Sequence, residues 1–220
     1  FSGSGSVQAM SALANDHYAG VAMQRSLLLL THEKLATPVL VDLYRLRSET
    51  EHDYDYAVQY AGQITETTAP VDYNRTQWSV LGEASGYQHL MGVASSRVSE
   101  PGRVTWLQGG RFNTWLSAAS EGELVFGQLG GNDASFNLRR DTTMILRQRG
   151  RDHLFASAFE THGFFHEASE RCYGARGELT RIRVIGHSHQ GSVVELVGKD
   201  LHLLVMVSNQ SDVTAASEHE

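Results

Sequence analysis

An acidic and an imidazole side chain stand two residues apart at the end of an apolar run. Glu160 and His162 follow Phe155–Phe159 and precede the turn residue Gly163. Because alternate residues of an extended chain share a face, both side chains point to the same side. Such a pair beside a glycine turn is typical of a cleft lining, and an ordinary surface ion pair is the alternative.

The densest group of titratable side chains is His52-Asp53-Tyr54-Asp55-Tyr56. Tyrosine and histidine can transfer protons, and a neighbouring carboxylate can shift the pKa of either. Alternation places the two aspartates on one face and His52, Tyr54 and Tyr56 on the other. The alternative is a polar strand whose rings pack inward.

His187 and His189 also share one face of an extended segment, which is a spacing that can bind a metal ion. They precede the turn Gln190-Gly191, and no third ligand stands nearby. We therefore expect exposed turn histidines and no metal site in this chain. Glycine-rich phosphate loops, nucleophile elbows and His-Glu-x-x-His motifs are also absent from the sequence, so we expect no complete set of catalytic residues.

Strand patterns dominate the chain that must position these residues. Val39, Val41 and Leu43 alternate with Leu40, Asp42 and Tyr44, which predicts a half-buried strand. Turns such as Gly109-Gly110 separate many short runs, which predicts an all-β fold, a large antiparallel β-sandwich forming a single domain over residues 1–220. The segment around Met10 fits a helix or a strand. The expected strands are Val21–Leu30, Pro38–Leu46, Tyr87–Ser95, Arg103–Leu107, Arg111–Ser117, Glu123–Leu129, Thr142–Gln148, His153–Glu160, Leu179–Ile185, Ser192–Val197 and Leu201–Ser208.

Composition excludes several classes of partner. The 220 residues carry a net charge of −7, which disfavours nucleic acid as a partner, and no apolar run is long enough to span a membrane. One cysteine allows no disulfide within the chain. From Phe1 in place of an initiator methionine we expect a piece of a longer protein, with a leftover linker at residues 1–6 as the alternative. The least ordered parts are expected to be residues 1–6 and 212–220. A local anion-binding patch is conceivable, with solvated strand ends as the alternative, at Arg139, Arg140, Arg147, Arg149 and Arg151.

Several segments together resemble a known family. Pro38–Leu46, His52–Asp55 and Tyr60–Gln63 resemble the start of the C-terminal β-sandwich of heparinase II/III-like polysaccharide lyases, with most similarity to the family 17 alginate and oligoalginate lyases. The order and spacing of the segments are more specific than any one of them. The sequence departs at Gln59, where the family often has a proton-carrying histidine. Further similar segments are Gly86–Leu90, Phe136–Asp141, Phe155–Gly163 and Gly191–Glu195.

The resemblance implies a function and several missing parts. Lyases of this family have an N-terminal α/α toroid and cleave uronate polysaccharides such as alginate by β-elimination. A tyrosine acts as base and acid, an Asn–His pair neutralises the substrate carboxylate, and a His/Asp/His site binds zinc. These motifs cannot be placed on this chain, so they are expected upstream of it, together with the zinc. The resemblance also implies a secreted or periplasmic protein, and it leaves the oligomeric state open.

One role carries over to this chain by resemblance. Glu160 is the best candidate for substrate binding, with His162 as its neighbour, because a carboxylate at a cleft rim can accept hydrogen bonds from sugar hydroxyls. His52, Tyr54 and Arg45 are weaker candidates.

Two rival interpretations remain. The first is a carbohydrate-binding or scaffold module without chemistry, in which Trp106, Trp115 and Tyr87 form an exposed platform, although inward packing is the commoner use of such rings. The second is a small stand-alone lyase that uses Tyr54 or Tyr56 with His52.

Overall fold

Antiparallel strands form almost the whole of the computed structural model, which describes residues 2–3, 5–72, 79–130, 133, 135 and 140–210. Within these residues the only helical turns are two 3-10 turns, η1 (Tyr87–His89) and η2 (Glu167–Ser169). The predicted all-β antiparallel fold is confirmed. No helix in the described part of the chain is long and apolar enough to cross a bilayer.

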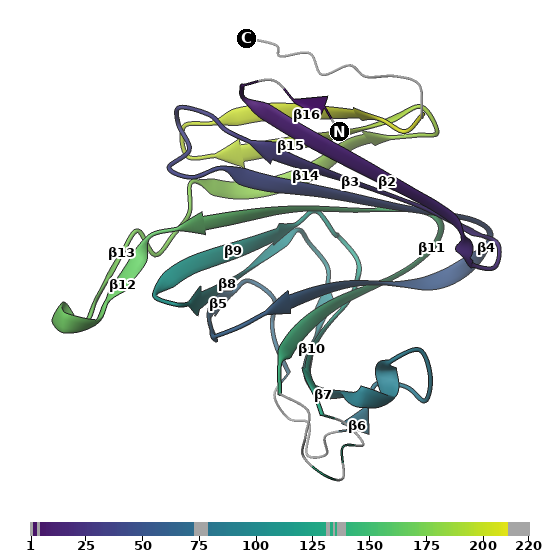
Figure 1. Ribbon diagram of the computed structural model, residues 1–220, viewed down its shortest axis with the longest axis horizontal. Coiled ribbons are helices and arrows are strands. Elements are labelled where there is room, and N and C mark those ends of the chain that lie inside the picture. Colours follow the sequence, from purple (N-terminus) through teal and green to yellow (C-terminus); the bar gives the residue numbers. More distant parts are fainter. Residues whose placement is uncertain are drawn as a thin grey trace.

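The strands belong to one large sheet, one small sheet and one hairpin (Figure 1). The main path of the large sheet runs β1-β2-β3-β4-β11-β10-β7-β6, while β9 joins β11 and continues through β8 to β5. Its strands are β1 (Ser2–Gly3), β2 (Val7–Tyr18), β3 (Val21–Leu30), β4 (Val39–Tyr60), β5 (Gln63–Thr67), β6 (Ser79–Val80), β7 (Leu90–Val98), β8 (Gly102–Gln108), β9 (Arg111–Ser117), β10 (Gly122–Leu129) and β11 (Thr142–His162). The small sheet consists of β14 (Leu179–His187), β15 (Gly191–Gly198) and β16 (His202–Ser208), and the hairpin of β12 (Phe164–His166) and β13 (Arg171–Tyr173).

Two long strands fold the large sheet over itself. β4 and β11 pair along most of their length, with a register shift between Gly150 and Asp152. The first half of β11 pairs with β10, and its last residues pair with β9. Figure 1 shows the resulting curvature, with β9 and β10 on separate branches of the large sheet. The sequence predicted two separate strands, one on each side of Gly150, because a glycine bulge looks like a turn in a local pattern.

Two buried clusters lie on the two sides of the first half of β4. One packs this part of the large sheet against the small sheet, and the other fills the fold of the large sheet. Burial of each large aliphatic side chain contributes about 1.5–3 kcal/mol, so both layers are stabilised through β4. The first cluster includes Leu28, Val39, Val41, Leu116, Ile182, Val194 and Leu196, and the second includes Tyr56, Trp106, Trp115, Met144 and Phe155.

The prediction that the Val39–Leu46 run is buried on one face only is wrong. Val41 and Leu43 face the small sheet, while Asp42 on the opposite face is 1% exposed. Asp42 is tolerated there because Arg25 Nη2 donates to its Oδ2 at 2.5 Å and Tyr56 Oη donates to the same oxygen at 2.6 Å. A buried carboxylate needs such partners, and here they come from the neighbouring strand β3 and from the second half of β4 itself.

Candidate functional site

Glu160 lies inside the protein near the end of β11, with 2% of its surface exposed. Its Oε1 accepts from the backbone N–H of Glu178 at 2.8 Å, and its Oε2 accepts from that of Leu179 at 3.1 Å. A Cβ atom on Gly177 would lie 2.2 Å from Oε2, so the segment before β14 packs directly on the carboxylate. The structure therefore places Glu160 in the interior, and neither at a cleft rim nor in a surface ion pair. Its contact with substrate stays a prediction.

His162 is buried beside Glu160 and anchors the same region. Because a carbonyl oxygen only accepts, the His162 Nδ1–H donates to the Gly174 oxygen, at 2.8 Å. Its Nε2 bonds to the Thr114 hydroxyl at 2.8 Å, and that hydroxyl bonds to the Thr105 hydroxyl at 2.8 Å. The two predicted residues thus lie together, and they hold both ends of the segment between β11 and β14.

The segment that these residues hold is a projecting hairpin, residues 163–174, which we call the arm. Figure 1 shows β12 and β13 extending away from both sheets. At its base, a Cβ atom on Gly163 would lie 2.1 Å from the Gly174 oxygen, and Gly163 has φ +46°. Only glycine fits this close backbone approach at a positive φ. The sequence interpretation did not single out the arm, and the available signal was the aromatic pair Phe164 and Tyr173 beside two glycines.

The cluster at 52–56 follows the predicted alternation, with Tyr54 and Tyr56 buried and Asp53 exposed. The Tyr54 hydroxyl donates to the Arg151 oxygen at 3.3 Å, and burial raises the pKa of Tyr56 well above its ordinary value. His52 bonds to the hydroxyls of Ser48 and Thr50, both at 3.0 Å, and has no bond to Tyr54. Both phenols are buried, burial raises the pKa of each, and His52 hydrogen-bonds to neither of them, so the arrangement does not support a stand-alone lyase.

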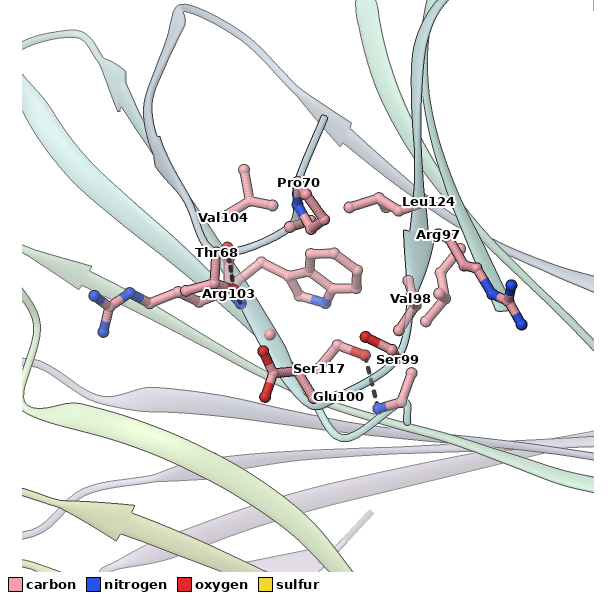
Figure 2. A pocket seen from close by; sticks show the side chains of 15 residues that line it. Thr68, Pro70, Arg97, Val98, Ser99, Glu100, Arg103, Val104, Ser117 and Leu124 are labelled. Atoms are coloured by element: carbon pink, nitrogen blue, oxygen red, sulfur yellow. Dashed lines mark hydrogen bonds between the residues drawn. The ribbon is translucent and has the colours of Figure 1, made fainter. Parts of the chain in front are cut away.

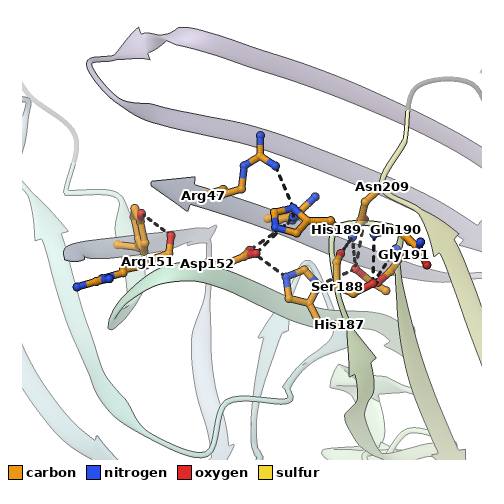
Figure 3. A network of polar contacts seen from close by, with 12 residues as sticks. Arg47, Arg151, Asp152, His187, Ser188, His189, Gln190, Gly191 and Asn209 are labelled. Carbon is orange, nitrogen blue, oxygen red and sulfur yellow. Dashed lines mark hydrogen bonds and ion pairs between the residues drawn. The ribbon is translucent and has the colours of Figure 1, made fainter. Parts of the chain in front are cut away.

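Arg45 belongs to a polar network that joins the two sheets. Figure 3 shows Arg47, Asp152, His187 and His189 of this network. Arg45 Nη2 and Arg47 Nη1 both donate to His189 Nδ1, at 3.2 and 3.0 Å. Asp152 accepts from His187 Nε2 at 3.2 Å and pairs with Arg45 at 3.4 Å. Burial raises the pKa of Asp152, but the hydrogen bonds from Arg45 and His187 outweigh it and leave that pKa below its ordinary value. The network therefore ties β4 and β11 to the turn between β14 and β15.

The two turn histidines are engaged separately within this network. Each is engaged by a different partner, Asp152 for His187 and the arginines for His189. No group of three or more His, Cys, Asp or Glu side chains that could hold a metal ion occurs in the described part of the chain.

An open cavity of about 470 Å³ lies next to this network. The turn between β2 and β3 forms one wall around Gly20, and polar side chains of β4 form another. The lining includes Arg47, Ser48, Glu49, Asp152 and His189. Because both signs of charge are present, the cavity favours no single ligand class.

A second cavity, of about 40 Å³, lies at one end of the core inside the large sheet. It is lined by Val104, Trp115 and Leu124, while Arg97 and Arg103 direct their guanidinium groups away from it (Figure 2). The volume has room for water but not for a sugar ring. It is therefore a packing gap.

The predicted aromatic platform is wrong. Trp106 and Trp115 are 6% and 2% exposed, and Trp115 Nε1 donates to the Ser157 hydroxyl at 2.9 Å. The Tyr87 hydroxyl bonds to Asp55, and the Arg147 guanidinium lies 5.9 Å from its ring centre. The two tryptophans pack inward inside the folded large sheet, and Tyr87 in η1 is engaged by Asp55 and Arg147.

Two arginines of the patch considered from sequence are paired with carboxylates in the structure. Arg147 forms two hydrogen bonds with Asp55, and Arg149 pairs with Glu51 and Asp53. Arg139 and most of the 136–141 segment of the family resemblance lie outside the described residues, as do residues 212–220.

Comparison with known proteins finds relatives over the full chain, although no family model matches it. An alginate lyase of Stenotrophomonas maltophilia is 33% identical over 223 aligned positions, which cover 100% of this chain and 30% of that protein. An exo-oligoalginate lyase of Saccharophagus degradans is 28% identical over 193 positions, which cover 85% of this chain and 26% of that protein. The chain thus spans less than a third of the length of these relatives.

The fold also occurs in solved structures. Heparan sulfate lyase HepC from Pedobacter heparinus matches with a TM-score of 0.55 and 12% sequence identity, covering 97% of this chain and 28% of that chain. A mutant of the same enzyme matches with a TM-score of 0.56. At this identity the match shows a common fold.

Proposed function

We propose, from the premise that this chain is a heparinase and alginate lyase-like domain, that it is the C-terminal part of an enzyme that cleaves uronate polysaccharides by β-elimination. The observation that supports this most is the 33% identity to an alginate lyase along the entire chain. Alginate is accordingly the proposed substrate. Such a polymer is met outside the cytoplasm, so we place the enzyme in the periplasm or among secreted proteins.

In this proposal the chain forms one side of the catalytic cleft and supplies no base. Tyr54 and Tyr56 are held in the core, and the described residues assemble no metal ligands. The catalytic tyrosine, the Asn–His pair and the zinc ion are assigned to the remaining polypeptide, in an N-terminal toroid. That toroid is the main partner of the surface that this chain presents.

Glu160 and His162 have an indirect part in the proposal. Their hydrogen-bonding atoms are occupied by the chain itself, at Glu178, Leu179 and Gly174. They act as positioning residues that fix the arm relative to the cleft. Arg45, also buried and paired, holds the two sheets together in the same indirect way.

The test compares the complete polypeptide with the 220-residue chain. Each is mixed with alginate, and the ultraviolet absorbance of the unsaturated product is followed. We expect turnover by the complete polypeptide and none by the chain alone. Turnover by the chain alone would show that it contains its own active site. A complete polypeptide that cleaves heparan sulfate and not alginate would overturn the substrate assignment.

A further inference from the structure

The arm presents two different faces. Phe164 pairs with Tyr173, and His166 pairs with Arg171 two positions farther along the hairpin. Because alternate residues point to the same side of a strand, these two pairs share a face. The opposite face carries the Phe165 and Cys172 pair.

The aromatic pair on the first face is exposed. The rings of Phe164 and Tyr173 are stacked with centres 5.1 Å apart, and the two residues are 41% and 45% exposed. Single exposed apolar residues are ordinary, but two stacked rings on a hairpin that leaves both sheets contribute nothing to either core. Such rings can cover the apolar C–H face of a sugar while its hydroxyls stay in water.

Two arginines flank the rings. The Arg111 guanidinium carbon lies 6.0 Å from the Phe164 ring centre, and Arg171 stands two pairs farther along the hairpin, on the same face as Phe164 and Tyr173. In the described part of the chain neither arginine forms an ion pair with a carboxylate. A guanidinium can bind a carboxylate through two parallel hydrogen bonds. The face therefore combines an apolar ring surface with guanidinium groups that can donate hydrogen bonds to an anion. Glu167 and Glu170 at the turn of the arm repel anions, so an anionic group is expected to bind at the two arginines.

The base of the arm is rigid, which reduces the cost of ordering it on binding. The Phe165 N–H donates to the Gly110 oxygen at 2.8 Å, in addition to the His162 bond to Gly174. Glu160 fixes the strand that leaves the arm through two backbone amides. The buried Glu160 and His162 at this end of β11 thus hold the base of the arm in place.

We propose that the face formed by Phe164, Tyr173, Arg111 and Arg171 binds an acidic oligosaccharide. The rings stack on sugar faces and the guanidinium groups bind the carboxylates of neighbouring uronate units. The identity of the ligand rests on the proposed function, whereas the surface and its residues go beyond it.

Isothermal titration of the 220-residue chain with alginate oligosaccharides tests this surface directly. Because no turnover is expected from the chain alone, the ligand is not consumed. The double variant Phe164→Ala/Tyr173→Ala should weaken binding about tenfold or more, the loss of two ring contacts. The variant Arg111→Gln should weaken binding about threefold and reduce its dependence on salt. Ile185→Ala, which removes another exposed apolar side chain far from the arm, should bind like the parent.

Three results would contradict the proposed binding of oligosaccharide at this surface. They are absence of binding by the parent chain, equal binding by the double variant, and equal binding of a neutral cello-oligosaccharide. Circular dichroism of each variant confirms that the sheets are intact. In the complete polypeptide, a double variant that melts earlier but keeps the parent affinity would show that the rings pack against protein. Alginate cleavage by the complete polypeptide is measured separately, so failure of the arm leaves the proposed function standing.

Discussion

At the scale of single residues, the burial of His153 makes the folding stability depend on pH. Its ring packs on Phe155 and Tyr54, and its Nε2–H donates to the Gln148 side-chain oxygen at 2.9 Å. Burial lowers the pKa of His153 from 6.5 to about 4, with a smaller contribution from His187. Between these pH values the unfolded chain binds a proton that the folded chain does not.

The contribution of the neutral His153 to the free energy of unfolding should therefore be fully present above about pH 6.5 and be lost as the pH falls toward about 4. The share of His153 in this loss is about 2 kcal/mol, reduced from the full shift for partial solvation. Urea unfolding at pH 7 and pH 4.5 measures it. The variant His153→Gln should lose less free energy of unfolding over that range than the parent. Identical losses in the two proteins would contradict the assignment.

Glu160 gives a second prediction at this scale. In Glu160→Gln the side chain keeps one acceptor oxygen, and its NH₂ group faces a backbone N–H. One buried amide loses its partner, which costs about 1–3 kcal/mol of unfolding free energy. Chemical denaturation measures the loss, with the exposed Glu33→Gln as a matched control. An unchanged midpoint would mean that Glu160 is not held as described.

The sequence predicted these residues only in part. The adjacency of Glu160 and His162 on one face was correct because it depends on strand period alone. Their burial could not be predicted, because the covering segment, residues 174–179, follows the arm, whose path no local pattern reports. The same reason accounts for Trp106 and Trp115, which are enclosed only after β11 bends.

At the scale of elements, the sequence predicted strand bounds correctly where the alternation of apolar and polar residues was uninterrupted. β3 and β9 have the predicted bounds, Val21–Leu30 and Arg111–Ser117. β11 was predicted as two strands because Gly150 is a bulge and not a turn. β12 and β13 were missed because three residues are too few to show a period.

The arm yields a prediction at this scale. In Gly163→Ala the new Cβ atom would meet the Gly174 oxygen at 2.1 Å and an unfavourable φ, so the arm must move. We expect about a tenfold loss of oligosaccharide affinity with far-ultraviolet circular dichroism close to that of the parent. Gly20→Ala is the control, since Gly20 has φ +74° but nothing within 4 Å of its Cβ position. Retained affinity in Gly163→Ala would show that the arm's position does not matter.

At the scale of the whole molecule, the two buried clusters meet at one strand pair. β4 contributes Val41 to the cluster under the small sheet and Tyr56 to the cluster inside the large sheet. The network of Arg45, Asp152 and His189 adds a polar link between the same layers. Mechanical coupling of this kind suits a domain that must present the arm in a fixed place.

If the layers are coupled, damage to one cluster must destabilise the other. Ile182 in β14 is 1% exposed, so Ile182→Ala should cost about 3 kcal/mol of unfolding free energy. Fluorescence from Trp106 and Trp115, which lie in the other cluster, is measured in a Trp78→Phe background and should report the same lowered midpoint as circular dichroism. Ile185→Ala on the same strand, at 54% exposure, should leave both midpoints unchanged. A fluorescence midpoint that stays at the parent value would mean that the small sheet unfolds independently, because only uncoupled layers can lose stability separately.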